Sequence, residues 1–125
     1  FKLSENRHVK DVMQGVTTFR SDTKITQILE VMEREGHNVY PVIAPESGKL
    51  VGIVTKADIQ DILLDTSMQD LPAIRVLDSA PVSVLPNDNL YTLYYRLHSE
   101  SAECAIVVDK QKRVLGVVTR ADILK

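Results

Sequence analysis

A threonine and an aspartate recur three residues apart at two places in the chain, each time at the end of an apolar run. The first copy, Gly52–Ile59, reads GIVTKADI, and the second, Gly116–Ile123, reads GVVTRADI and lies 64 positions later. Each copy predicts a buried strand that ends at the threonine and leads directly into a helix. The free N–H groups of a helix start favour an anion, and an ionised aspartate can accept hydrogen bonds from both hydroxyls of a vicinal diol.

The same residues also have a purely structural interpretation. A threonine followed three residues later by an acidic residue is a capping box, which stabilises a helix by about 1 kcal/mol in any soluble protein. The basic residues Lys56 and Arg120 between them fit either an anion site or an ordinary helix surface. The duplication favours ligand binding, but both interpretations stay open at this point.

Composition excludes several functional classes. The 125 residues are 44% hydrophobic, which suffices for one compact unit that buries roughly two-thirds of its unfolded surface. A formal net charge of −2 gives no general attraction to nucleic acid or anionic lipid. No apolar run approaches the roughly 18 residues that cross a bilayer, and no signal segment is present. We therefore expect no nucleic-acid partner and no membrane contact by this stretch.

Catalytic and metal chemistry also lack support. The single cysteine, Cys104, cannot form an internal disulfide, and its spacing from the three histidines matches no metal site. No nucleophile stands beside a base, so we expect no catalytic residues, no required cofactor and no enzyme activity. A reducing, cytoplasmic setting fits. Because the chain starts at Phe1 and stops inside a helical pattern, we expect it to be a piece of a longer polypeptide.

The elements that position the first Thr-Asp pair follow one order. After a loose lead-in at residues 1–8 come a short apolar helical turn and a strand at 16–20, with a helix cap at 21–23. The next helix carries apolar residues at i, i+3, i+4 and i+7 and ends near Glu35, where Gly36 can adopt the left-handed conformation. Strands at 39–43 and 50–54 then lead into the helix that starts at Thr55. The apolar residues of the helical turn are Val9, Val12 and Met13, and those of the helix are Ile25, Ile28, Leu29 and Met32.

The second half repeats this order. A strand at 82–85 and a helix start at 86–88 precede a helix whose stripe is Leu90, Leu93, Tyr94 and Leu97, each 65 positions after its counterpart. Strands at 104–108 and 114–118 follow at an offset of 64, which places a one-residue loss between helix and strand. The prediction is an α/β (α+β) fold of two βαββα repeats, at 9–64 and 73–125, joined by a linker at 65–72. A half of about 60 residues is marginal alone, so we expect the sheets to pack together about a pseudo-twofold axis.

At this point the chain resembles the paired cystathionine-β-synthase-type domains, known as CBS pairs or Bateman modules. The likeness rests on Val9–Met13 (VKDVM), on Tyr40–Ile43 (YPVI), and on the Gly-x-x-Thr-x-x-Asp string that ends both repeats. It covers nearly the whole chain from about Val9. The second half is the looser copy, with Asp78 assigned to the position of Met13 and Ala105 to that of Pro41.

The resemblance implies a regulatory module that binds AMP, ADP, ATP or S-adenosylmethionine in clefts between the repeats. It assigns the ribose hydroxyls to Asp58 and Asp122 and the phosphate or ribose to Thr55 and Thr119. It assigns adenine to backbone near the starts of the first two strands of each repeat. By position these segments are Val16, Thr17, Asn38, Val39 and Tyr40 in one repeat, and Pro81, Val82, Ala102, Glu103 and Cys104 in the other.

Charge favours the first cleft for a phosphorylated ligand. Lys56 is joined there by His37 and Arg34, whereas Arg120 in the second is accompanied by Glu100 and Glu103. His37 is also compatible with an ordinary loop histidine, and Cys104 with a small buried apolar residue.

The main alternative is a ligand-free interaction module. Tyr91 and Tyr95 lie outside the Leu90-Leu93-Leu97 stripe, and this surplus of apolar surface predicts a homodimer formed through the amphipathic helices. The effector that such a module would control stays open among a channel or other transporter, a nucleotide-metabolising enzyme, a kinase-type system and a stand-alone protein. If the effector spans a membrane, this stretch would be its cytosolic domain.

Overall fold

A computed structural model describes residues 6–125, and residues 1–5 of the predicted lead-in lie outside the described part. The residues divide into two compact units. One consists of residues 17–80 and the other of the N-terminal stretch up to Val16 together with 81–125. We call them the Asp58 unit and the Asp122 unit. Within residues 6–125 no helix combines the length and apolar character needed to span a membrane.

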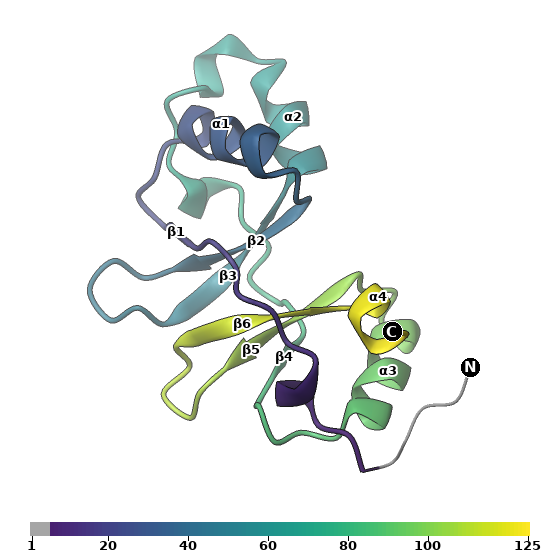
Figure 1. The fold of residues 1–125 in the computed structure, drawn as a ribbon. Coiled ribbons are helices and arrows are strands. Elements are labelled where there is room, and N and C mark those ends of the chain that lie inside the picture. Colours follow the sequence, from purple (N-terminus) through teal and green to yellow (C-terminus); the bar gives the residue numbers. More distant parts are fainter. Residues whose placement is uncertain (1–5) are drawn as a thin grey trace. The chain divides into compact units, whose positions relative to one another are not determined.

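The Asp58 unit contains one three-stranded sheet with the order β1-β2-β3. Strand β1 (Phe19–Arg20) pairs parallel with β2 (Val39–Ile43), which pairs antiparallel with β3 (Leu50–Thr55). Helices α1 (Ile25–Glu35) and α2 (Lys56–Leu63) lie beside each other on this sheet (Figure 1). The 3-10 turns η2 (Thr66–Met68) and η3 (Ala73–Arg75) complete the unit. The predicted β-α-β-β-α order is therefore present.

The Asp122 unit repeats this arrangement. Strand β4 (Ser83–Val84) pairs parallel with β5 (Cys104–Val108), which pairs antiparallel with β6 (Val114–Thr119). Helix α3 (Leu90–Ser99) contacts the short helix α4 (Arg120–Ile123), and the 3-10 turn η1 (Val9–Asp11) packs in this unit. The fold is thus mixed α/β with two three-stranded sheets, whereas the packing of one sheet on the other stays a prediction.

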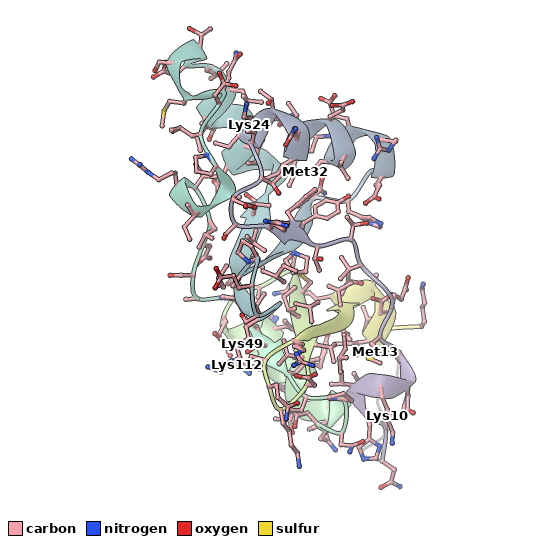
Figure 2. The ribbon with its side chains drawn as sticks, turned by 90° about the vertical axis from the view of Figure 1, so that its left-hand side faces the viewer. Lys10, Met13, Lys24, Met32, Lys49 and Lys112 are labelled. Atoms are coloured by element: carbon pink, nitrogen blue, oxygen red, sulfur yellow. The ribbon has the colours of Figure 1, made fainter. Side chains whose placement is uncertain are left out.

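The predicted apolar stripes form the two cores. Ile25, Ile28 and Met32 of α1 are fully buried, and Figure 2 shows Met32 on the side of α1 that faces the sheet. In α3 the buried residues are Leu90, Leu93 and Leu97. Two half-buried members, Leu29 and Tyr94, border these stripes.

The N-caps of α1 and α3 lie one to three residues after the predicted caps at 21–23 and 86–88. The N-cap of α1 is Lys24, whose side chain has no acceptor and makes no cap bond, and Asp22 pairs with Arg20 at 2.9 Å. The N-cap of α3 is Asn89, whose side chain accepts a hydrogen bond from the Thr92 amide. At the other end of α1, Gly36 has the predicted left-handed conformation with a φ of 83°.

The compact units do not follow the sequence repeats at their N-terminal ends. Residues 9–16 precede the first repeat's sheet in sequence but belong to the Asp122 unit, where the Leu90 amide donates to the Arg7 carbonyl at 2.9 Å. Residues 73–80 correspondingly belong to the Asp58 unit. Each segment ends in an antiparallel bridge to the last strand of its unit, formed by Gln14 with Val117 and by Asp78 with Ile53.

These bridges explain the glycine that opens each repeated string. A Cβ added at Gly52 would collide with the carbonyl oxygen of Asp78, and one at Gly116 would collide with that of Gln14. Gly52→Ala should therefore lower the free energy of unfolding by about 1–3 kcal/mol, the usual cost of overpacking, as measured by urea denaturation. Gly15→Ala is the matched control, since a Cβ at Gly15 would meet nothing within 4 Å. Equal stability of the two variants would contradict the close approach.

Candidate functional site

The strand-to-helix turn has the same backbone geometry in both units. Strand β3 ends at Thr55, whose Oγ1 accepts a hydrogen bond from the Asp58 amide at 3.2 Å. Thr119 at the end of β6 likewise accepts from the Asp122 amide at 3.1 Å. The repeated string therefore forms the predicted strand, N-cap and helix twice.

The two aspartate side chains have different surroundings. The Asp122 carboxylate accepts from the Thr119 amide at 2.9 Å and from the side-chain amide of Gln14, and the Lys125 ammonium lies 3.8 Å away. Asp122 is only 5% exposed. Asp58 is exposed, and no donor within residues 6–125 bonds its carboxylate. The Asp58 carboxylate is therefore open, whereas the Asp122 carboxylate is occupied.

This difference bears on the choice between ligand site and helix cap. The reciprocal capping box is complete at Thr119 and Asp122, so the structural interpretation accounts for that pair. At Thr55 and Asp58 only half of the box exists, because the carboxylate does not reach back to the Thr55 amide. Helix capping therefore does not use the Asp58 carboxylate.

The helix starts are less open to an anion than the sequence suggests. The Lys56 amide donates to the Asn38 carbonyl at 2.8 Å, and the Asp58 amide is bonded to Thr55. The Arg120 amide similarly donates to the Glu103 carbonyl at 3.3 Å. Two of the first three amides of each helix already have acceptors, so an anion would depend mainly on side-chain charge.

The basic residues of the two turns also differ. The Arg120 guanidinium donates to the carbonyls of Leu97 at 2.9 Å and Ala102 at 3.0 Å, so it bonds one carbonyl in the last turn of α3 and one in the loop that follows. The half-buried Lys56 has no acceptor for its ammonium within residues 6–125. Lys56 is the basic residue that remains available to a ligand.

The segments predicted to hold the base in the first repeat lie largely in the Asp58 unit. Thr17 begins this unit and donates from Oγ1 to Glu35 at 2.9 Å, whereas Val16 belongs to the other unit. The exposed His37 ring contacts the buried Tyr40 ring edge-on, with centroids 5.9 Å apart. The structure brings Asn38 against Lys56, as given above, and Val39 opposite Thr55 in the β2–β3 ladder.

In the second repeat the equivalent segment lies one residue later than predicted. Cys104 pairs with Thr119 as Val39 pairs with Thr55, and the Glu103 carbonyl takes the place of the Asn38 carbonyl. The segment equivalent to Asn38–Tyr40 is therefore 103–105, not 102–104. Of the predicted residues, Val82 is buried, Pro81, Ala102 and Cys104 are half-buried, and Glu103 is exposed.

The register also relocates the missing residue. Both the helix and the second strand of the Asp122 unit keep the offset of 65, and the loss falls in the turn between β5 and β6. That turn comprises residues 109–113, whereas the turn between β2 and β3 comprises 44–49. By the same register Ala105 corresponds to Tyr40, not to Pro41, and Asp78 corresponds to Gln14, not to Met13.

Cys104 provides a test of the second segment. Burial, and secondly the charge of Glu103, raise the pKa of the Cys104 thiol from 9.0 to about 11. Iodoacetamide should therefore alkylate the folded protein at pH 8 about 100-fold more slowly than the urea-unfolded chain, because only the thiolate reacts. Stability should also fall between pH 9 and 11, where the folded thiol retains a proton that the unfolded thiol has lost. Equal alkylation rates would place the thiol in solvent.

Sequence reasoning missed Gln14. Nothing in its spacing links Gln14 to Asp122, which lies 108 positions later, and only the bridge to Val117 brings them together.

Within residues 6–125, no three His, Cys, Asp or Glu side chains gather as metal ligands.

The CBS domain profile matches the chain twice, at residues 9–65 and 73–125. Among curated relatives, inosine-5'-monophosphate dehydrogenase of Escherichia coli K12 is 28% identical over 122 residues, which cover 95% of this chain and 24% of the dehydrogenase. The chain thus spans about a quarter of that relative's length.

Solved structures show the same fold at lower identity. The CBS domain pair of protein MJ0100, in complex with 5-methylthioadenosine and S-adenosyl-L-methionine, matches with a TM-score of 0.81 and 24% identity, covering 94% of this chain and 93% of that one. The CBS domain of a bacterial CNNM/CorC family Mg²⁺ transporter, in complex with ATP, matches with a TM-score of 0.84 and 20% identity, covering 96% and 86%.

Proposed function

This chain belongs to the CBS domain family, with two copies of the domain in tandem, and we propose that it is a ligand-sensing regulatory module for an adenosyl compound. The observation that carries the proposal is the open Asp58 carboxylate, with Lys56 in the same first turn of α2. Such a carboxylate can accept both ribose hydroxyls, and the ammonium can neutralise a phosphate. The module is not itself an enzyme; it would act by changing an attached or associated effector.

The residues assigned to the ligand are those of the Asp58 unit. Asp58 would bind the ribose, Thr55 and Lys56 the phosphate or ribose, and backbone at Thr17 and 38–40 the adenine. The MJ0100 and CorC-type complexes support the ligand class, because both hold adenosyl compounds on the same fold. AMP, ADP, ATP and S-adenosylmethionine are all retained as candidates, and His37 favours those that carry phosphate.

The effector would be an enzyme or a transporter. The dehydrogenase relative is about four times longer than the matched region, and the CorC-type neighbour is part of a transporter. Both support a module that operates beside other domains. We propose that it does so in the cytoplasm, where adenine nucleotides are present, whether or not the effector spans the membrane.

A thermal-melt screen tests the proposal. The chain is heated with AMP, ADP, ATP, S-adenosylmethionine or NAD, each against a buffer control. A ligand at 100 times its Kd stabilises the folded state by about 2.7 kcal/mol, which gives a clear rise in Tm. The absence of any shift with millimolar ligand, in protein that melts cooperatively, would contradict nucleotide sensing and leave the ligand-free interaction module.

The surface of α3 supports dimerisation as a further part of the proposal. Tyr95 is 58% exposed and Tyr91 38%, with their rings 5.0 Å apart, and Leu64 beyond α2 is 85% exposed. Aromatic residues are enriched at protein interfaces. We propose that a second copy of this chain covers these exposed side chains in a homodimer. Sedimentation at micromolar concentration should give about twice the 14.0 kDa chain mass. Tyr95→Glu should shift the protein to monomer, with exposed Thr92→Glu on the same helix as the charge-matched control.

A further inference from the structure

Gln14 and Asp78 occupy equivalent positions in the two units. The Gln14 amide donates to the Val117 carbonyl at 3.0 Å and the Val117 amide donates back at 2.9 Å. Asp78 and Ile53 exchange the same pair of hydrogen bonds at 2.8 and 2.9 Å. Ile53 and Val117 each stand two residues before the N-cap threonine. The two side chains therefore start from matched backbone beside matched strand-to-helix turns.

The side chains nevertheless do different things. The Gln14 carboxamide donates from Nε2 to Asp122 Oδ1. Asp78 turns back on its own backbone, since its Oδ1 accepts from the Ala80 amide at 2.9 Å, and it makes no hydrogen bond with Asp58. A carboxylate could not serve as the donor that Gln14 supplies, because an ionised carboxylate only accepts. At this equivalent position, a glutamine bonds the Asp122 carboxylate, whereas an aspartate leaves the Asp58 carboxylate open.

Occupation matters because a vicinal diol needs both carboxylate oxygens. At Asp122, Oδ1 is bonded by Gln14 and Oδ2 by the Thr119 amide, and the residue is 5% exposed. A diol would have to displace the Gln14 amide and find room beside it. Asp58 is exposed, and neither carboxylate oxygen accepts a hydrogen bond from residues 6–125. The carboxamide of Gln14 thus stands where a ligand hydroxyl would have to donate.

We propose that Gln14 is a specificity-determining residue that acts as an internal occupant of the Asp122 unit and leaves Asp58 as the one adenosyl site of the chain. The inference rests on the proposed function. It adds that the asymmetry arises from the pair Gln14 and Asp78, since the threonine and the aspartate of the repeated strings are the same residue types in both units.

The first test transfers the occupant to the open unit. Asp78→Gln places the longer carboxamide beside Asp58, and the Kd for ATP or AMP, measured by isothermal titration calorimetry, should rise about 10- to 100-fold, the equivalent of one charge-assisted hydrogen bond. Asp78→Asn is the matched control. It removes the same charge and keeps a short side chain that can accept from Ala80, so its Kd should stay within about threefold of the unmodified protein.

The second test removes the occupant from the closed unit. The unmodified chain should bind one ATP or AMP, and Asp122→Asn should leave that affinity unchanged. Gln14→Ala frees Oδ1 of Asp122, while Oδ2 keeps the Thr119 amide and can still accept through its second lone pair. The variant should therefore add a second, weaker site, which the double variant Gln14→Ala/Asp122→Asn should lack. Circular dichroism and urea denaturation establish that each variant is folded.

The outcomes separate the two proposals. Two sites in the unmodified chain, one unchanged site in Gln14→Ala, or equal affinities of Asp78→Gln and Asp78→Asn would each overturn the role of Gln14 while nucleotide binding stands. No binding of either nucleotide by any folded variant would overturn the proposed function and, with it, this inference. Binding by Gln14→Ala alone would place the site at Asp122 and would overturn the inference that Asp58 is the one adenosyl site.

Discussion

Asp58→Ala is expected to weaken adenosyl-ligand binding by about 2–4 kcal/mol while the fold survives. Two charge-assisted hydrogen bonds, at about 1.5–3 kcal/mol each, lose their acceptor, and water recovers part of the loss. The Asp58 carboxylate makes no hydrogen bond within residues 6–125, so its removal should barely change the free energy of unfolding. Calorimetry gives the affinity and urea denaturation gives the stability.

Asp122→Ala is the matched control for this result. It removes the acceptor of the Thr119 amide and of the Gln14 carboxamide, so stability should fall by about 1–2 kcal/mol and affinity should stay the same. Asp58→Ala would then lower affinity without changing stability, and Asp122→Ala would lower stability without changing affinity. An unchanged affinity in folded Asp58→Ala would rule out the ribose role of Asp58.

Local pattern predicted most of the secondary structure. The run 39–43 becomes β2 with the same bounds, and the i, i+3, i+7 stripe of α1 is buried as its spacing indicates. These features depend only on neighbours in sequence, which is why they can be read from it. The CBS-type resemblance, confirmed by the two profile matches, followed from the repetition of such features and not from any single motif.

Features that depend on distant residues were not predictable. The offset of 65 at Cys104 is defined by its pairing with Thr119 across the β5–β6 ladder, and sequence alone placed the lost residue too early. The N-cap of α1 is Lys24, while Asp22 pairs with Arg20, and capping preferences alone predicted neither. The difference between the two Thr-x-x-Asp strings is partly of the same kind, since one of the two hydrogen-bond donors to Asp122 is a glutamine far away in sequence.

Tyr40 gives the largest expected change in stability. It is fully buried in β2, with the Phe19 ring at 5.2 Å and the His37 ring at 5.9 Å between centroids. Tyr40→Ala should lower the free energy of unfolding by about 3–5 kcal/mol, because a buried aromatic ring is replaced by a cavity. The register places Ala105 at the equivalent position of the Asp122 unit, so alanine itself suits this backbone and the cost would come from lost packing.

The hydroxyl of Tyr40 should lower the stability of the folded protein, whereas the ring raises it. It is buried without a hydrogen-bond partner in residues 6–125, and burial, followed by the nearby Glu35 carboxylate, raises the pKa of Tyr40, so the phenol stays neutral. Tyr40→Phe removes this unsatisfied group and keeps the ring, and should therefore stabilise the protein by about 1 kcal/mol in urea denaturation. A loss of 1 kcal/mol or more in the free energy of unfolding would instead show that the hydroxyl is bonded in solution, with the nearby Glu35 carboxylate as the candidate acceptor. In that case Glu35→Gln should lower the free energy of unfolding by a similar amount. The same substitution made in Tyr40→Phe should cause no further loss, because both changes would remove the same hydrogen bond.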